Sequence, residues 1–134
     1  MIVTIIEGYE LSYTLARILR LLNHRVNIIK QESDANMDSF NEPGVNTIVG
    51  AGLDVDVLSQ PCISESDVFI VLMDNDLDNL EACLYIKNNF VNKRTITKVN
   101  NPKYVRKFEQ VGIDIAVNGA LFTLNSISSG REVQ

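Results

Sequence analysis

The strongest constraint on the fold of this chain is an uncharged, apolar run from Val68 to Met73. The run, Val-Phe-Ile-Val-Leu-Met, is rich in β-branched and aromatic residues, which favour a strand. Because polar and apolar residues do not alternate along it, both faces of this strand must be covered. Such strands are typical of the interior of a parallel sheet that has helices on both sides.

The rest of the chain alternates between the patterns of strands and of helices. Short β-branched runs predict further strands at residues 2–6, 26–29, 45–49, 95–99 and 113–117. Apolar residues three and four positions apart predict helices at residues 11–22, 54–58, 74–89, 102–111 and from 118 onward. The polar, weakly periodic segment 32–40 is expected to form a short or frayed helix. The helix at 54–58 is expected to stop before Pro61.

This alternation predicts an α/β fold, a Rossmann-like three-layer sandwich whose six-stranded parallel sheet has helices on both faces. We assign residues 1–125 to this domain. We expect residues 126–134 to fray, because the apolar pattern stops there. In such sheets, ligands bind beyond the carboxyl ends of the strands, near the first strand.

Composition narrows the class of function. With 134 residues, 46% of them hydrophobic, the chain suffices for one domain with a proper core. A net charge of −5 disfavours nucleic acid as a partner, because phosphate contacts need clustered Lys and Arg. No apolar run is long enough to span a membrane, and Met1 leads directly into the first strand, so we expect a cytoplasmic protein. Cys62 and Cys83 lack metal-ligand spacing and are expected to be buried free thiols.

The turn between the first strand and the first helix is where a nucleotide site belongs, but its usual residues are missing. Dinucleotide-binding folds carry G-x-G-x-x-G here, so that the backbone can approach the pyrophosphate closely. In this chain Glu7, Tyr9 and Ser12 occupy the three glycine positions, and Gly8 and Glu10 lie between them. A carboxylate and an aromatic ring therefore stand where phosphates would bind, and we expect NAD(H) to bind poorly or not at all.

Further candidate ligand-binding residues follow the second, third and fourth strands. They are Lys30, Gly50, Ala51, Gly52, Met73 and Asp74. Asp74, Asp76 and Asp78 form an acidic cluster in the first turn of a predicted helix, where carboxylates favour the positive end of the helix dipole. Helix capping is one interpretation of this cluster. A metal site is the other, although one short segment offers no second group of ligands.

Three segments have a specific pattern. They are Val49-Gly50-Ala51-Gly52, the Asp-x-x-Asn-Leu-x-Ala-Cys pattern from Asp76 to Cys83, and residues 99–114, which begin Val-Asn-Asn-Pro-Lys-Tyr. Together they resemble the nucleotide-binding domain of the regulator-of-potassium-conductance family, and the likeness covers about residues 1–125. The resemblance implies a non-catalytic domain of Trk- or Ktr-type potassium transporters, or of potassium channels. It implies a Rossmann-like fold that binds NAD(H) or ATP/ADP and changes the shape of an oligomeric ring.

At the ligand positions the chain departs from the family pattern. Lys30 stands where the family's second strand ends in an acidic residue, Ala51 replaces the aspartate of Gly-Asp-Gly, and Met73 replaces a threonine. The basic residue of the fifth strand is kept as Lys98. The resemblance thus implies the fold but leaves the cofactor unknown: NAD(H) is disfavoured, and AMP, ADP and ATP are the remaining candidates.

Two other classes of function are open at this stage. An NAD-dependent oxidoreductase would need an acid or base beside the nicotinamide and a substrate domain. An α/β scaffold or receiver-like module would need no small ligand.

The sequence also leads to two structural expectations. Glu7 and Lys30 follow neighbouring strands, so we expect their charged groups to pair across the vacated cleft, with both pointing to solvent as the alternative. The apolar residues of segment 121–127 have little sheet left to cover, so we expect them to form an interface. That interface predicts a homodimer or higher oligomer, or a hetero-oligomer with a nucleotide-binding paralogue, beside a membrane potassium transporter subunit.

Overall fold

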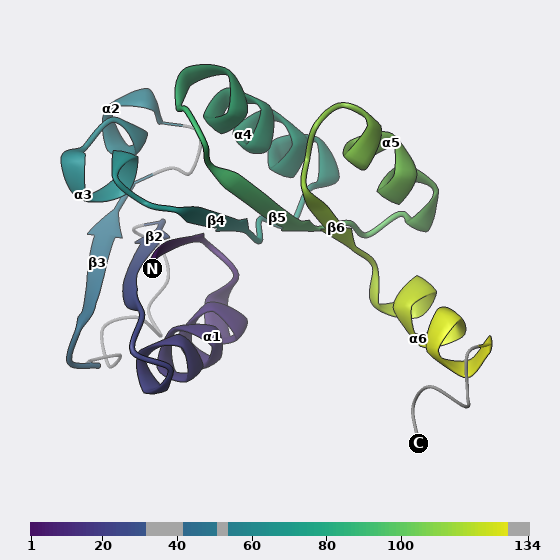
Figure 1. Cartoon of the computed structure of the whole chain (residues 1–134), viewed down its shortest axis with the longest axis horizontal. Coiled ribbons are helices and arrows are strands. Elements are labelled where there is room, and N and C mark those ends of the chain that lie inside the picture. The colour runs from purple at the N-terminus through teal and green to yellow at the C-terminus, as the bar shows by residue number, and fades with distance from the viewer. Residues whose placement is uncertain (32–41, 51–53, 129–134) are drawn as a thin grey trace.

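The computed structural model describes residues 1–31, 42–50 and 54–128, which form one six-stranded sheet with helices on both faces (Figure 1). The strands are β1 (Ile2–Ile6), β2 (Arg25–Lys30), β3 (Val45–Val49), β4 (Val68–Val71), β5 (Arg94–Lys98) and β6 (Ile115–Val117). The helices are α1 (Tyr9–Leu21), α2 (Val55–Leu58), α3 (Pro61–Ser64), α4 (Asp76–Asn89), α5 (Val105–Gln110) and α6 (Gly119–Ser128). A 3₁₀ turn, Pro102–Tyr104, precedes α5.

The strand order is β3-β2-β1-β4-β5-β6, and every neighbouring pair is parallel. From β1 the chain first builds the sheet outward through β2 and β3, then returns to β4 on the other side of β1. The gap between β1 and β4 at their carboxyl ends is therefore the topological switch point, where ligands of such sheets bind. The predicted α/β class, with a parallel sheet covered on both faces, is confirmed.

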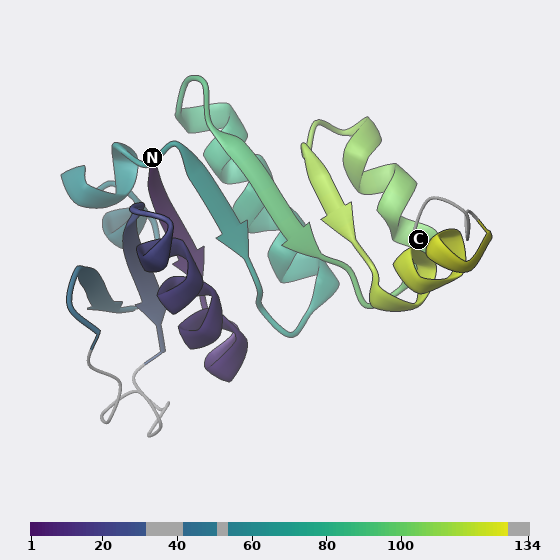
Figure 2. The same ribbon diagram turned by 60° about the horizontal axis from the view of Figure 1, so that its bottom comes forward.

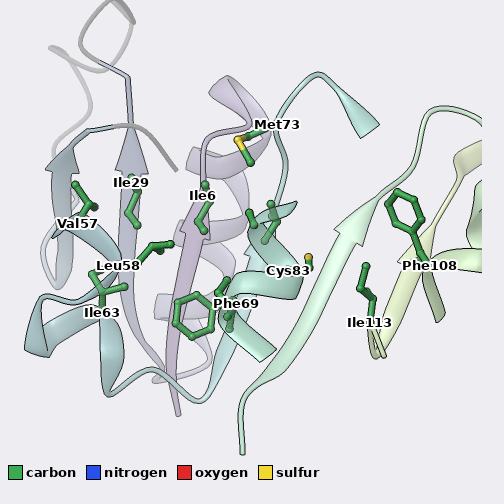
Figure 3. Close-up of a cluster of buried hydrophobic side chains, with 14 of the residues drawn as sticks. Ile6, Ile29, Val57, Leu58, Ile63, Phe69, Met73, Cys83, Phe108 and Ile113 are labelled. Carbon is green, nitrogen blue, oxygen red and sulfur yellow. The ribbon is translucent and has the colours of Figure 1, made fainter. Parts of the chain in front are cut away.

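Each face of the sheet has its own hydrophobic cluster. Because successive side chains of a strand point to opposite faces, Ile5 packs beneath α1 and Ile6 packs on the other side. Figure 2 shows α1 on one face of the sheet and α4 and α5 on the other. The larger cluster lies on the α4 side, where Phe69 and Ile63 are fully buried (Figure 3).

A row of polar side chains crosses β1, β2 and β3 inside the sheet. Thr4, Asn27 and Asn46 are register partners. Thr4 and Asn27 are buried, and the Thr4 hydroxyl lies 2.6 Å from that of Ser66. Asn27 Nδ2 donates to Thr4 Oγ1 at 3.2 Å and to the Cys62 carbonyl at 3.0 Å. These bonds satisfy the polar groups, which explains why polar residues are tolerated in the middle of these strands.

Two strand boundaries differ from the predicted ones by two residues, and those of β2 and β5 differ by one. β4 ends at Val71, because the backbone N–H and C=O of Met73 bond to the side chain of Asn79 and leave the sheet. β6 begins at Ile115, two residues later than predicted, because the Asp114 carboxylate accepts the backbone N–H of Thr95. In both places a side chain replaces the neighbouring strand as the hydrogen-bond partner.

The helices also differ from the prediction, by two residues at the starts of α1 and α4 and more clearly around α3 and α6. α2 stops before Pro61 as predicted, but Pro61 then begins α3, a one-turn helix that the sequence analysis does not predict. Proline is well suited to the first helical position, where its missing N–H has no partner to lose. α6 continues to Ser128, beyond residue 126, where fraying was expected to begin. The predicted helix at 32–40 lies outside the described residues.

The two cysteines have different environments. Cys83 is buried as predicted, and burial raises the pKa of its thiol to about 12. Cys62 is exposed, contrary to the prediction, because the one-turn helix α3 buries only Ile63. In the described part of the chain, no helix is both long and apolar enough to cross a membrane.

Candidate functional site

The turn between β1 and α1 keeps a glycine-type backbone although it has lost glycine side chains. Glu7, Gly8 and Tyr9 all have positive φ, at 59°, 98° and 49°. Positive φ is unfavourable for residues with a Cβ and is common only for glycine. The first two glycine positions of the dinucleotide motif, now Glu7 and Tyr9, therefore still have the conformation for which the motif uses glycine.

Gly8, the one glycine left in this turn, is tightly enclosed. A Cβ added to it would lie 2.8 Å from Cβ of Leu72. Its carbonyl accepts the backbone N–H of Leu11 at 3.1 Å and so starts α1. No side chain caps this helix N-terminus, so the first N–H groups of α1 face the turn in the way that favours an anion.

A small pocket lies at this helix N-terminus. It is lined by Glu7, Gly8, Tyr9, Ser12, Tyr13, Ile28, Lys30 and Gln31. Its cavity volume is about 10 Å³, which is room for about one water molecule. The structure thus brings five of the predicted site residues together, but leaves no space there for a ribose or a phosphate.

Glu7 is the half-buried acid of this pocket. Burial, followed by the charges of Asp74 and Asp78, raises the pKa of the Glu7 carboxyl above its ordinary value, and a hydrogen bond with Gln31 opposes the rise. Glu7 therefore has acidic neighbours in the place of the predicted basic one. Lys30 lines the same pocket, but no ion pair within 4.0 Å joins Lys30 Nζ to the Glu7 carboxylate in the described residues.

The predicted ion pair between Glu7 and Lys30 is therefore wrong for this structure. Neighbouring strands bring the two residues to one pocket. There the Glu7 carboxylate is hydrogen-bonded with Gln31 and feels the charges of Asp74, which precedes α4, and of Asp78, in the first turn of α4.

Replacing Glu7 by Gln should stabilise the fold at neutral pH by about 0.5 kcal/mol, a value kept small because the group is partly exposed. The raised pKa means that ionisation of Glu7 costs folding stability. The stability that protonated Glu7 contributes is fully present below its unfolded-state pKa near 4.5 and is lost as pH rises through the folded-state pKa, so the cost of ionisation is present at neutral pH. Urea unfolding near pH 4 and pH 7 should therefore show the gain of Glu7→Gln only at the higher pH.

Glu10→Gln is the matched control, because Glu10 lies in the same turn and is exposed. It should give no gain at either pH. An equal gain for Glu7→Gln at both pH values would contradict the assignment of the effect to the Glu7 charge.

One residue of the acidic cluster after β4 binds the backbone of a neighbouring loop. Asp76 accepts the backbone N–H groups of Asn100 and Asn101 at 2.7 and 3.0 Å and so holds the loop after β5. Asn75 is the residue that caps α4, because its side chain accepts the N–H groups of Leu77 and Asp78. The capping interpretation is therefore confirmed for Asp76 and Asp78, which lie in the first turn of α4, whereas Asn75 supplies the capping hydrogen bonds and Asp74 precedes the helix. The described residues contain no group of three or more side chains suited to a metal ion.

Asn79 explains another part of the pattern that begins at Asp76. Its side chain is fully buried and bonds to the backbone N–H and C=O of Met73, and to the carbonyl of Lys98 at 3.3 Å. The side chain of Met73 points into the core beside Ile6 and Cys83 (Figure 3). Lys98 Nζ lies 4.0 Å from the exposed carboxylate of Asp74, at the open edge of the sheet.

The other predicted site residues have mixed roles. Ser12 is buried, and its hydroxyl donates to the carbonyl of Tyr9 at 2.6 Å. Gly50 donates to the carbonyl of Lys30 at 2.7 Å, and a Cβ on Gly50 would lie 2.6 Å from Val57. Ala51 and Gly52 lie outside the described residues.

A parallel sheet in this strand order, with an uncapped helix N-terminus at its switch point, defines a Rossmann-like domain of the nucleotide-binding class. Residues 3–119 match the TrkA-N domain family. The chain belongs to that family, and the resemblance to potassium-conductance regulators is confirmed.

Named relatives and solved structures are consistent with this assignment. The Trk system potassium uptake protein TrkA homolog of Methanothermobacter thermautotrophicus is 32% identical over 118 residues, which make up 88% of this chain and 54% of that protein. The chain therefore spans about half the length of this relative. The structure of the GsuK channel bound to NAD has a TM-score of 0.72 at 21% identity and covers 86% of this chain and 21% of the channel chain.

The Shewanella denitrificans Kef CTD in its AMP bound form has a TM-score of 0.78 at 10% identity, over 95% of this chain and 77% of that one. At such identities these structures show a shared fold.

Proposed function

We propose that this chain is a non-catalytic regulatory domain of a potassium uptake system, at the cytoplasmic side of the membrane. In this proposal it acts by assembling with other copies, or with a nucleotide-binding paralogue, beside a membrane potassium transporter subunit. The family and the named potassium uptake relative support the potassium system. The altered β1–α1 pocket supports a regulatory domain whose own nucleotide site is closed to dinucleotides.

The pocket is the observation that carries this proposal. Its volume of about 10 Å³ excludes a pyrophosphate, and the Glu7 carboxylate stands at the helix N-terminus that would hold it. A like charge near phosphate is repelled by up to about 4 kcal/mol at 4 Å in a medium of intermediate dielectric. NAD(H) is thus disfavoured. AMP has one phosphate and needs fewer contacts with this turn, so it is the least excluded of the adenine nucleotides.

Two alternatives from the sequence have less support. A short-chain dehydrogenase in complex with NADP shares the fold at a TM-score of 0.57 and 14% identity. In this chain, however, Glu7 places an acid in the β1–α1 turn, where the pyrophosphate of a dinucleotide binds in such folds. A scaffold without a small ligand agrees with the closed pocket. It differs from our proposal in requiring no potassium transporter as partner.

Helix α6 supports the assembly part of the proposal. It extends away from the sheet (Figure 1) and buries none of its residues. Phe122, Leu124 and Ile127 are 66%, 61% and 71% exposed, and the helix has no charged residue. An exposed apolar surface of this kind marks an interface, so a second copy of this helix is the partner we propose.

Replacing Phe122 and Ile127 together by Glu should weaken self-association by about 100-fold, because both side chains would be charged where the partner helix packs. Sedimentation velocity at tens of micromolar should show the wild-type chain at twice its 15.0 kDa mass and the variant as a monomer. Val91→Glu is the matched control, because Val91 is 81% exposed and lies outside α6. A monomeric wild-type chain, or a dimeric double variant, would contradict the α6 interface.

A further inference from the structure

Helix α6 has little packing against the rest of the domain. None of its side chains is fully buried, and no strand or helix of the described residues packs extensively against it. Asn118, by contrast, is 9% exposed and sits between β6 and α6. The bonds of this side chain therefore connect α6 to the body of the domain.

Both the oxygen and the nitrogen of the Asn118 side-chain amide form hydrogen bonds. Its Oδ1 accepts the backbone N–H of Leu121 at 3.0 Å, and its carbonyl accepts that of Phe122 at 2.9 Å, so it starts the helix. Its Nδ2 donates to the carbonyls of Val99 at 2.8 Å and Asn100 at 3.1 Å, at the carboxyl end of β5. One side chain thus fixes both the first turn of α6 and the loop after β5.

The loop after β5 is in turn hydrogen-bonded to the loop after β4, where a ligand was predicted to bind. Asn100 Nδ2 donates to the carbonyl of Asp74 at 2.6 Å, and the backbone N–H of Asn100 donates to the Asp76 carboxylate at 2.7 Å. Asp74 is the residue whose carboxylate lies 4.0 Å from Lys98. A continuous series of hydrogen bonds therefore runs from Asp74, beyond the carboxyl end of β4, to α6, which packs little against the rest of the domain.

We infer that Asn118 is a positioning residue that couples the carboxyl edge of β4 and β5 to the orientation of α6. A ligand or partner that moves Asp74 would pull on Asn100, and Asn100 and Asn118 would transmit the movement to the helix. The inference rests on the proposed function, since α6 is the proposed interface. It adds the route by which the site and the interface influence each other.

Hydrogen exchange of the α6 amides in Asn118→Asp tests this coupling without a ligand. Aspartate keeps the side-chain oxygen that caps α6 and adds a charge that favours the helix N-terminus, but it loses both Nδ2 donors. If Asn118 only caps the helix, the α6 amides of the variant should exchange at the wild-type rate or more slowly. If it anchors the helix, they should exchange about tenfold faster.

Asn100→Ala provides a second readout, because the Asn100 side chain bonds to the carbonyl of Asp74, at the end of the series that lies farthest from α6. Coupling predicts that this variant also speeds exchange in α6, by about threefold. Asn101→Asp is the matched control: Asn101 Oδ1 caps the 3₁₀ turn, and the change costs no link to α6. It should leave α6 unchanged.

Wild-type exchange in α6 after Asn118→Asp, an unaffected α6 in Asn100→Ala, or unprotected α6 amides in the wild-type chain would each overturn the inference. A failure of the proposed interface would show separately, as a monomeric wild-type chain in sedimentation, and it would leave these exchange rates interpretable.

Discussion

A variant that combines Glu7→Gly, Tyr9→Gly, Ser12→Gly and Lys30→Asp should bind NADH at least about 100-fold more tightly than the wild-type chain. The substitutions remove a carboxylate from the helix N-terminus and remove the Tyr9 ring from the place where the pyrophosphate would approach the backbone. They also supply the acid that binds a ribose in dinucleotide-binding folds. Isothermal titration calorimetry should show micromolar binding for the variant and no micromolar binding for the wild-type chain.

The backbone favours this outcome. Glu7 and Tyr9 already have positive φ, so glycine at these positions relieves about 1 kcal/mol of strain each. Tyr9 is 52% exposed and loses little packing. The cost lies at Ser12, where glycine weakens the helix by about 1 kcal/mol and removes the hydroxyl bonded to the Tyr9 carbonyl. The quadruple variant should therefore fold.

Tyr9→Gly alone is the control, because it opens the turn but keeps the Glu7 charge. It should bind NADH no better than about tenfold over the wild type. If the quadruple variant folds and still ignores NADH and ATP, these four positions did not close the site, and Ala51 is the next candidate.

Gly8→Ala should destabilise the fold by about 3 kcal/mol, which is a large fraction of the stability of a domain this size. Two independent costs add here. A residue with a Cβ is strained at the φ of 98° that Gly8 adopts, at about 1–2 kcal/mol. The new Cβ would also meet the Leu72 side chain at 2.8 Å, and overpacking of this kind costs about 1–3 kcal/mol.

Urea unfolding measures this loss directly, and Gly119→Ala is its matched control. A Cβ on Gly119 meets nothing within 4 Å, and alanine favours the start of α6. Gly119→Ala should therefore leave stability unchanged or slightly raised. A loss of less than about 1 kcal/mol for Gly8→Ala would show that the β1–α1 turn and Leu72, which follows β4, can move apart to make room for the new Cβ.

The order of elements could be predicted from the sequence because their patterns are local. The uncharged run from Val68 and the helical spacing from Leu11 each concern residues close together in the chain. Periods of two and of 3.6 residues separate strands from helices, and their alternation leads to a parallel sheet. The place of the candidate site followed as well, because ligands of such sheets bind where the strand order reverses.

The partners of individual side chains could not be predicted in this way. Glu7 and Lys30 were expected to pair because their strands are neighbours, but in the folded chain the Glu7 carboxylate is hydrogen-bonded with Gln31 and feels the charges of Asp74 and Asp78. Likewise, Asn79 and Asn118 carry no sequence signal for the strand ends they bind, which lie 19 residues away.

The sequence by itself therefore determined the class of fold, the approximate bounds of most elements and the edge of the sheet where a ligand would bind. Only the tertiary structure decided that the pocket is small, that Asp76 and Asn79 bond to the backbone after β5 and β4, and that Asn118 bonds both to α6 and to the backbone after β5. The physical reason is the distance along the chain between the residues that interact. Secondary structure follows from patterns among near neighbours, whereas a buried amide or carboxylate bonds to whichever backbone groups the completed sheet brings beside it.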